Sequence, residues 1–301
     1  MSKFIPSGMG WRPDLPDPRD YTPWQKRVLP LLRHLKRRRG KSYPKKVDIR
    51  RDADGDYFTP PEDQGPLGCS SAWSVLSLIE YFERRCCGRT FEGSALFLYK
   101  VARNLARQQN RVTGDTGSDL RTTLKAVARF GVPGEQHWPY DVDRFDEEPS
   151  AFLYALAQSL SRIRYFRLDA RNGDGARTLQ VVKSFLAAGF PVAFGFSVPT
   201  SLNSSPYIPF RPDLDSLRGG QAVVAVGYSE KHPGPTKQVL LVRSSWGTAW
   251  GDAGYGWLPC AYLRNGLARD CWTLVRRDWV ESDEFSLPTV IDSREETRSS
   301  S

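Results

Sequence analysis

One segment of the sequence predicts a helix that begins at a serine, Ser70. Gln64-Gly65-Pro66-Leu67-Gly68-Cys69-Ser70-Ser71-Ala72 runs into apolar residues at three- and four-residue intervals, which predict a helix over 70–87. Serine is a favoured helix N-cap, so capping alone accounts for Ser70 and Ser71. The same place also stabilises an anion, because the first backbone N–H groups of a helix are unpaired. A nucleophile placed here would be activated, and the side chain present is an alcohol.

Two later segments each combine a strand pattern with a polar residue. The run Gln221-Ala222-Val223-Val224-Ala225-Val226-Gly227-Tyr228 follows Gly219-Gly220 and predicts a strand over 221–228. A second strand is expected over 238–243, before Ser244-Ser245-Trp246-Gly247-Thr248-Ala249-Trp250-Gly251. The loop over 229–236 turns the chain back, so Ser244 is expected to return to the neighbourhood of Gln221. At about 3.3 Å per residue, the first strand carries the loop and His232 about 23 Å away.

Together the three segments resemble the papain-like cysteine peptidases, in particular a bacterial branch. In that family they read Asp-Gln-Gly-x-Leu-Gly-Ser-Cys-Thr-Ala, Gly-Gly-His-Ala-Val-x-Ala-Val-Gly-Tyr and Arg-Asn-Ser-Trp-Gly-Thr-x-Trp-Gly. Further stretches resemble the same branch in the same order: Gly8 to Asp17, Gly114 to Gly117, Trp138 to Asp141 and Gly254 to Pro259. Caps, a buried strand and turns explain each segment singly but not their common order. The resemblance implies an α+β, two-lobe fold, with a helical lobe around a central helix packed against an antiparallel β-barrel-like lobe.

The resemblance places Ser70, Gln221 and Ser244 where the family has its catalytic cysteine, histidine and asparagine. A serine must pass its proton to a base as it attacks. A glutamine amide cannot accept a proton at physiological pH. We therefore predict a degenerate peptidase site, with no metal and no cofactor, that binds a peptide or protein partner between the lobes without cleaving it.

Other parts of the family's machinery are retained by the same resemblance. Gln64 matches the oxyanion-hole glutamine, and Trp246 matches the tryptophan that shields the histidine–asparagine pair. Gly68 and Gly220 belong to the framework that supports the cleft. Such a site is expected to bind a peptide carbonyl but to turn it over negligibly.

An alternative function uses a different nucleophile. Cys69 adjoins Ser70, but successive helical residues are rotated by about 100°, so Cys69 is expected to face away from the cleft if Ser70 faces it. A buried thiol is the ordinary interpretation of such a residue. The alternative is an atypical hydrolase or acyltransferase that uses Ser70 or Cys69, with its base supplied by substrate or partner.

The pattern of the chain predicts an arm, two lobes and a tail. We expect an N-terminal arm over 1–45, a papain-like domain over 46–277 and an acidic, disordered tail over 278–301. Within the domain, 46–162 should be mainly helical and 163–277 mainly β. Helices are expected over 70–87, 94–106, 120–130, 150–159 and 179–188, and strands over 191–198, 221–228, 238–243 and 271–275.

Charge and cysteine content suggest where and with what the protein acts. The net charge is +9, and a basic run in the arm includes Lys36, Arg37, Arg38 and Arg39. This run is compatible with an anionic partner, nucleic acid or membrane surface, with a solvated linker, with pairing to the acidic tail, or with an arm that occupies the cleft as peptidase pro-segments do.

The five cysteines form an odd set without metal-site spacing, and no apolar run approaches the roughly 18 residues of a membrane span. Residues 1–10 lack a secretory-signal pattern. These features predict a protein of the reducing cytoplasm.

Overall fold

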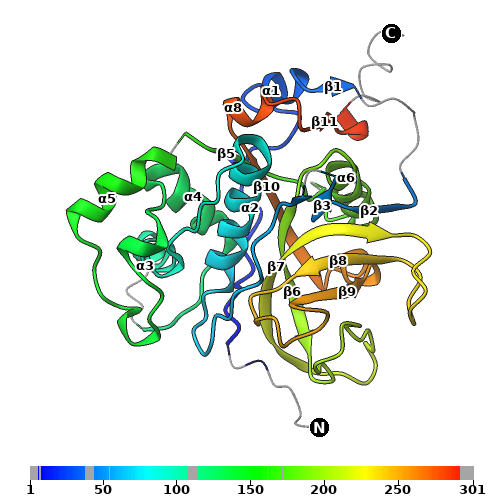
Figure 1. Ribbon diagram of the computed structural model, residues 1–301. Coiled ribbons are helices and arrows are strands. Elements are labelled where there is room, and N and C mark those ends of the chain that lie inside the picture. Colours follow the sequence, from blue (N-terminus) through cyan, green and yellow to red (C-terminus); the bar gives the residue numbers. More distant parts are fainter. Residues whose placement is uncertain are drawn as a thin grey trace.

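The structure, a computed structural model, describes residues 6, 8–37, 44–53, 55–107, 114–160, 162–170 and 172–291. The helices are α1 (Leu29–Arg33), α2 (Ser70–Cys87), α3 (Ala95–Arg107), α4 (Leu120–Phe130), α5 (Ala151–Ala157), α6 (Gly175–Ala187), α7 (Ala261–Arg264) and α8 (Arg277–Val280), with short 3₁₀ turns at Glu135–His137, Val142–Arg144 and Gln158–Leu160. Helices α3, α4 and α5 gather on one side, and the antiparallel sheet lies on the other side together with α6 (Figure 1). The two-lobe α+β fold predicted from the sequence is therefore confirmed.

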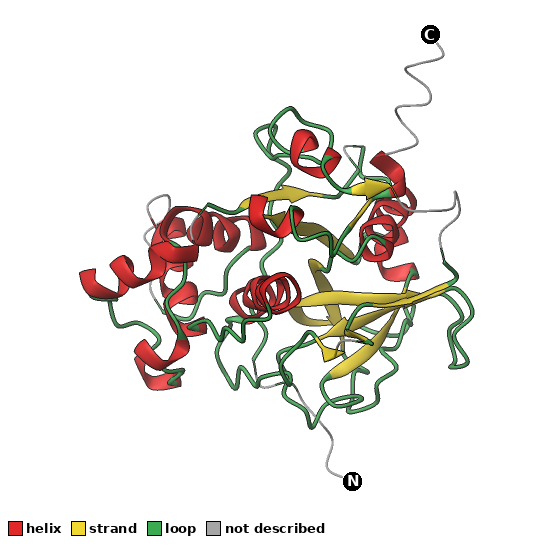
Figure 2. Cartoon of the chain, turned by 45° about the horizontal axis from the view of Figure 1, so that its top comes forward, coloured by secondary structure: helices red, strands yellow, loops and turns green. Residues whose placement is uncertain are grey.

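The long helix α2 lies between the two lobes, as Figure 2 shows nearly end-on. Every residue from Ser70 to Glu83 is buried, because the helix packs against α3 and α4 on one side and the sheet on the other. It ends at Gly88, whose left-handed backbone (φ 62°) accommodates the usual glycine C-cap. Burial on all sides fixes the position of its first residue, Ser70, relative to both lobes.

The second lobe is built on one antiparallel sheet. Its strand order is β5 (Arg164–Arg167), β10 (Ala268–Val275), β6 (Val192–Pro199), β7 (Leu217–Ser229), β8 (Val239–Arg243) and β9 (Tyr255–Pro259). A further strand, β2 (Lys46–Asp48), pairs with the end of β7. Short pairs are formed by β1 (Lys36–Arg37) with β11 (Ser286–Leu287) and by β3 (Arg51–Asp52) with β4 (Gly55–Asp56).

The register of this sheet places the predicted polar residues. Gln221 on β7 lies opposite Phe196 on β6. Arg243, the last residue of β8, pairs with Val224 on β7. Ser244 follows Arg243 directly and therefore lies close to Gln221, which is only a few residues before Val224 on β7. The hairpin therefore returns the chain as the sequence predicted.

Several element boundaries differ from the prediction for local reasons. Helix α6 begins at Gly175 rather than 179, because the Asp174 side chain caps it by accepting a hydrogen bond from the Arg177 N–H (3.0 Å). Strand β7 extends back to Leu217, and strands β5 and β9 were not predicted.

The acidic C-terminal region is also more ordered than predicted. Residues 278–301 were expected to form a disordered tail, but the part up to 291 contains most of α8 and all of β11. Trp279 is fully buried and stacks on Phe82 of α2 at 4.8 Å, and Phe285 and Ile291 are buried as well. The apolar side chains between the acids dock this segment. The remainder, 292–301, lies outside the described residues.

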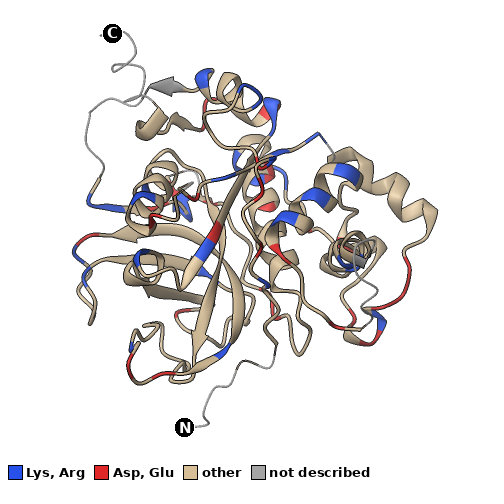
Figure 3. Cartoon of the chain, turned by 180° about the vertical axis from the view of Figure 1, so that it is seen from behind, with Lys and Arg blue, Asp and Glu red and all other residues tan. Residues whose placement is uncertain are grey.

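Charged residues are interspersed over both lobes rather than gathered by sign (Figure 3). Of the basic run in the arm, Lys36 and Arg37 form β1, while Arg38 and Arg39 lie outside the described residues. Among the helices of the described ranges, none is long and apolar enough to cross a membrane.

Candidate active site

Ser70 lies at the junction of the two lobes. It is the first residue of α2 and fully buried, and its hydroxyl oxygen accepts a hydrogen bond from the backbone N–H of Ala222 at 3.2 Å. The turn before the helix is fixed by Asp115, whose carboxylate accepts from the Gly68 N–H at 3.0 and 2.9 Å. These contacts hold the start of α2 against β7, beside Gln221.

Gln221 belongs to a buried cluster of neutral polar groups, although its own Oε1 has no hydrogen-bond partner among the described residues. Its amide nitrogen donates to Oε1 of Gln64 at 2.9 Å and to the hydroxyl of Ser245 at 3.2 Å. The Ser245 hydroxyl donates to the same Gln64 oxygen at 2.6 Å. Gln64 and Gln221 are fully buried, and Ser245 is nearly so. The cluster can exchange hydrogen bonds but holds no group that accepts a proton near neutral pH.

The serine that meets Gln221 was not the one that the sequence indicated. Ser244 is buried, but its hydroxyl oxygen has no hydrogen-bond partner among the described residues. The neighbouring Ser245 bonds to both glutamines. In the sequence, Ser245 matches the serine of the family's Arg-Asn-Ser-Trp-Gly pattern, and one residue along an extended segment reverses the direction of the side chain.

The histidines lie elsewhere. His232 is buried at the far end of the β7–β8 hairpin, where its ring packs against Trp257 with centroids 4.1 Å apart. Burial lowers the pKa of His232, and the positive charges of Lys46 and Lys237 lower it further. His34 and His137 are exposed. Among the described residues, no histidine hydrogen-bonds to Ser70 or Cys69.

The Cys69 thiol contacts Tyr140, whose hydroxyl donates to the backbone carbonyl of Gln64 at 2.6 Å. Cys69 is fully buried, occupies the N-cap position of α2, and its sulfur lies 3.1 Å from the Tyr140 hydroxyl. Burial raises the pKa of the Cys69 thiol to about 12, against a smaller opposing effect of the Tyr140 hydrogen bond. The thiol is therefore protonated at neutral pH, which makes it a poor nucleophile.

The groove between the lobes is filled by the chain's own N-terminal arm. In Figure 1 the arm runs between the helical lobe and the sheet. The N–H groups of Gly10 and Trp11 both donate to the Gly220 carbonyl, at 2.9 and 3.0 Å. On the other wall, the Ser118 N–H donates to the Gly10 carbonyl at 3.0 Å, and the Arg12 N–H donates to the Ser118 carbonyl at 3.3 Å. The arm thus bridges both lobes through its backbone.

The arm also occupies the groups beside Ser70. The Gln64 amide nitrogen, the predicted oxyanion donor, donates to the Met9 carbonyl at 3.1 Å and to the Leu67 carbonyl at 2.7 Å. The indole N–H of Trp246 donates to the Gly8 carbonyl at 3.3 Å. Any outside peptide carbonyl would have to displace the arm before it could reach these donors.

Glycines make the close contact of arm and groove possible. A Cβ on Gly10 would lie 2.0 Å from the Gly68 carbonyl oxygen, and a Cβ on Gly195 would lie 1.8 Å from the Trp11 ring. Gly10 also has a positive φ of 136°, which side-chain-bearing residues rarely adopt. Trp11 is consequently buried, with 7% of its surface exposed.

We expect Trp11→Ala to release the arm. Truncating a buried tryptophan costs about 3–5 kcal/mol, and here the loss falls mainly on docking of the arm rather than on the core. Backbone amides of residues 10–12 should then exchange with deuterium far faster than in the wild type. Leu15→Ala is the control, because Leu15 is 85% exposed. Unchanged exchange at residues 10–12 in Trp11→Ala would contradict the expectation.

The family model for papain family cysteine proteases matches residues 43–266. The chain belongs to the papain family. An uncharacterised peptidase C1-like protein of Acanthamoeba polyphaga mimivirus is 31% identical over 220 residues, which cover 70% of this chain and 68% of the relative.

Solved structures of this family show the same architecture. Xylellain, a cysteine protease from Xylella fastidiosa, is 30% identical, with a TM-score of 0.72, and the match covers 92% of this chain and 98% of that protein. Bromelain from Ananas comosus, at 19% identity and a TM-score of 0.56, shares the fold. Peptidase 1 of Psoroptes ovis is 28% identical over 226 residues, 71% of this chain and 60% of the relative.

Proposed function

We propose that this member of the papain family is catalytically inactive and that Ser70, Gln221 and Ser244 stand at the family's catalytic positions. The observation that carries the proposal is the position of Gln221. Its amide nitrogen donates to Gln64 and Ser245, and its Oε1 has no hydrogen-bond partner among the described residues, where a proton acceptor would be required. An alcohol without a base cannot attack a peptide bond at a useful rate.

Residual machinery would not compensate for this loss. Gln64 remains as an oxyanion donor, but its amide is engaged by Met9 and Leu67. In subtilisin, removal of the catalytic triad lowers kcat about a millionfold and leaves only a thousand- to ten-thousandfold acceleration over water. A bound peptide would therefore persist rather than be cleaved.

As part of the same proposal, the protein acts by binding a peptide or protein partner in the groove between the lobes. The groove walls support this idea, because they already hold an extended segment, residues 8–12, through backbone hydrogen bonds to Gly220 and Ser118. Main-chain hydrogen bonding of this kind gives affinity to extended peptides in general. A partner would have to compete with the arm.

We also place the protein in a reducing cytoplasm, a proposal supported by five free thiols.

The alternative is a hydrolase or acyltransferase that uses Ser70 or Cys69. The burial of Cys69, its contact with Tyr140 and its raised pKa count against it as nucleophile. Ser70 has no titratable partner among its hydrogen bonds in the described ranges, since its hydroxyl accepts only from a backbone N–H.

The test is a pair of assays on the purified full chain. We expect a thiol-directed epoxide probe to leave Cys69 unlabelled at pH 7.5, because less than about one thiol in ten thousand is ionised there at a pKa of about 12. We also expect no hydrolysis of a fluorogenic peptide library beyond the level of a Ser70→Ala variant. Labelling of Cys69, or cleavage that Ser70→Ala abolishes, would establish the alternative instead.

A further inference from the structure

Just after the segment in the groove, the arm is anchored by a cluster of charged groups. Asp14 and Asp20 of the arm meet Asp169 and Asp270 of the second lobe around two guanidinium groups, those of Arg121 on α4 and Arg167 on β5. The Asp20 carboxylate lies 2.6 Å from Arg121 and 3.1 Å from Arg167. The cluster is the point at which the arm leaves the groove.

Asp14 is the member of the cluster that joins arm to lobe most directly. Its carboxylate pairs with Arg167 and lies 3.3 Å from Arg121, while its backbone N–H donates to the Asp270 carboxylate at 3.0 Å. Its side chain is 5% exposed, and its second oxygen, Oδ2, has no hydrogen-bond partner among the described residues. Asp14 therefore lies deep in the cluster, close to another carboxylate.

Four carboxylates share two cations, the buried Arg167 and the partly exposed Arg121, so the fully ionised cluster carries two negative charges in excess. Asp270 also lies against Arg167 at 3.1 Å and is 2% exposed. Asp169 is held by the N–H groups of Asp270 and Cys271, at 3.1 and 2.7 Å, and its carboxylate is 3.9 Å from Arg167. Undocking the arm would move Asp14 and Asp20 into water and would remove the excess negative charge from the cluster.

Nearby exposed charges do not cancel this excess. Arg19 is 88% exposed and pairs with Asp17 at 2.6 Å. Arg269, which precedes Asp270, and Arg177 on α6 are exposed, so solvent screens their charges. The ring of Trp272 lies under Arg167 and Arg121, at 4.6 and 5.8 Å, and supplies no counter-charge.

We propose that the N-terminal arm is held over the groove by a proton-dependent latch, in which Asp14 docks most tightly when its carboxyl group is protonated. A neutral Asp14 removes one of the two excess charges and its repulsion with Asp270. The inference goes beyond the proposed function and holds whether or not Ser70 can react.

The direction of titration supports this latch. Burial and the Asp270 charge raise the pKa of Asp14 to about 7, although Arg167 and Arg121 act in the opposite direction. Burial likewise raises the pKa of Asp169 to about 6 and that of Asp270. A free arm would return Asp14 to an ordinary aspartate pKa of about 3.9. The docked state thus binds more protons than the undocked state between those values, and docking strengthens as the pH falls.

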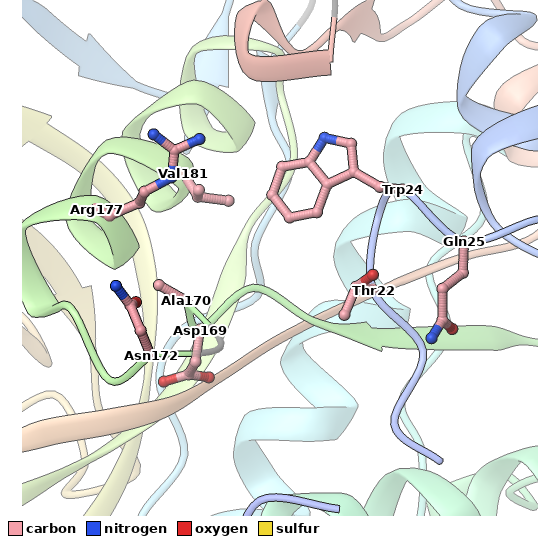
Figure 4. A pocket seen from close by; sticks show the side chains of 8 residues that line it. All are labelled: Thr22, Trp24, Gln25, Asp169, Ala170, Asn172, Arg177 and Val181. Atoms are coloured by element: carbon pink, nitrogen blue, oxygen red, sulfur yellow. The ribbon is translucent and has the colours of Figure 1, made fainter. Parts of the chain in front are cut away.

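Solvent protons can reach the cluster. A cavity of about 550 Å³ is lined by Asp14, Asp20, Arg167, Asp169 and Asp270. It adjoins a second hollow, which shares Thr22 and Asp169 with it. In Figure 4, Trp24 and Thr22 of the arm face Arg177 and Val181 of α6 across this hollow. The latch can therefore equilibrate with bulk pH without unfolding.

Hydrogen exchange measured on the full chain tests the latch. The readout is the protection factor of the amides of residues 10–12, each rate being divided by its intrinsic rate at the same pH. Between pH 8 and pH 5.5, protection should rise about thirtyfold for one proton with a docked pKa of about 7. This titration of the wild type needs no variant, and the amides of α2 report whether global stability changes alongside.

Two matched variants assign the effect. Asp14→Asn, a neutral isostere, should give high protection at pH 8 and lose most of the pH dependence. Asp17→Asn in the same arm should keep the wild-type profile, because Asp17 is paired outside the cluster and Arg19 lowers its pKa. Protection that is flat or falls on acidification in the wild type, or an undiminished pH dependence in Asp14→Asn, would overturn the proposal.

Discussion

Replacing Ser70 by cysteine, Gln221 by histidine and Ser244 by asparagine in a Trp11→Ala background is expected to raise peptide hydrolysis at least about a thousandfold over the Trp11→Ala protein. Position 70 already lies at a helix N-terminus, where unpaired N–H groups lower the pKa of a thiol. The Ser70 hydroxyl is 3.2 Å from the N–H of Ala222, so an imidazole at position 221 would begin beside it. Trp11→Ala is included because the arm covers these groups.

The measurement is second-order labelling by a thiol-directed epoxide together with hydrolysis of a fluorogenic peptide. The matched control omits only Gln221→His and should retain less than about a hundredth of the activity, since general-base catalysis contributes a factor of 10²–10⁴. With the native Trp11, the three catalytic replacements should give much slower labelling. If all four changes yield a folded but unreactive protein, as judged by circular dichroism, then this groove is not a peptidase site that has lost only its reactive groups.

Replacing Arg167 by leucine is expected to destabilise the fold by about 3–5 kcal/mol at pH 7.5, because removing one partner of a buried ion pair leaves uncompensated charge. Arg167 is 9% exposed and faces Asp14, Asp20 and Asp270, as well as Asp169 at a longer distance. Without it, only Arg121 opposes the four carboxylates. Thermal unfolding should show a fall in Tm of roughly 10 °C.

The pH dependence distinguishes this electrostatic loss from lost packing. Lowering the pH to 5 protonates carboxyl groups whose pKa is raised, including those of Asp14 and Asp169, so the difference from the wild type should shrink. Arg19→Leu is the control, with an expected change within about 0.5 kcal/mol, because its ion pair is exposed. An Arg167→Leu penalty that is small, or equal at both pH values, would show that the cluster is not strained by excess negative charge.

Some parts of the site could be predicted from local sequence because they depend on residues close together in the chain. The pattern after Cys69 predicted α2, and the observed helix has the same limits, Ser70–Cys87. Two apolar segments separated by a short polar loop likewise predicted a hairpin over 221–243, which returns Ser244 towards Gln221. The structure pairs these segments as adjacent antiparallel strands.

Other parts required the tertiary structure. Which of two adjacent serines meets Gln221 depends on the exact direction of the chain after β8, and the sequence favoured Ser244 where Ser245 makes the contact. The N-cap of α2 is Cys69 rather than a serine, and the Cys69 thiol contacts Tyr140 from a distant loop. A contact across 71 residues leaves no local pattern.

By itself, the sequence determined the position of the central helix through its apolar periodicity, and it determined the family and the two-lobe fold through the resemblance carried by motifs in short stretches. It left open what the arm does, with a solvated linker, an anionic partner, the acidic tail and the groove all compatible with its composition. Only the tertiary structure places Gly10 against Gly68 and Trp11 against Gly195. That placement rests on close fit and on contacts such as the hydrogen bond from the Asp14 N–H to the Asp270 carboxylate, 256 residues away, and such long-range contacts are decided by the folded shape alone.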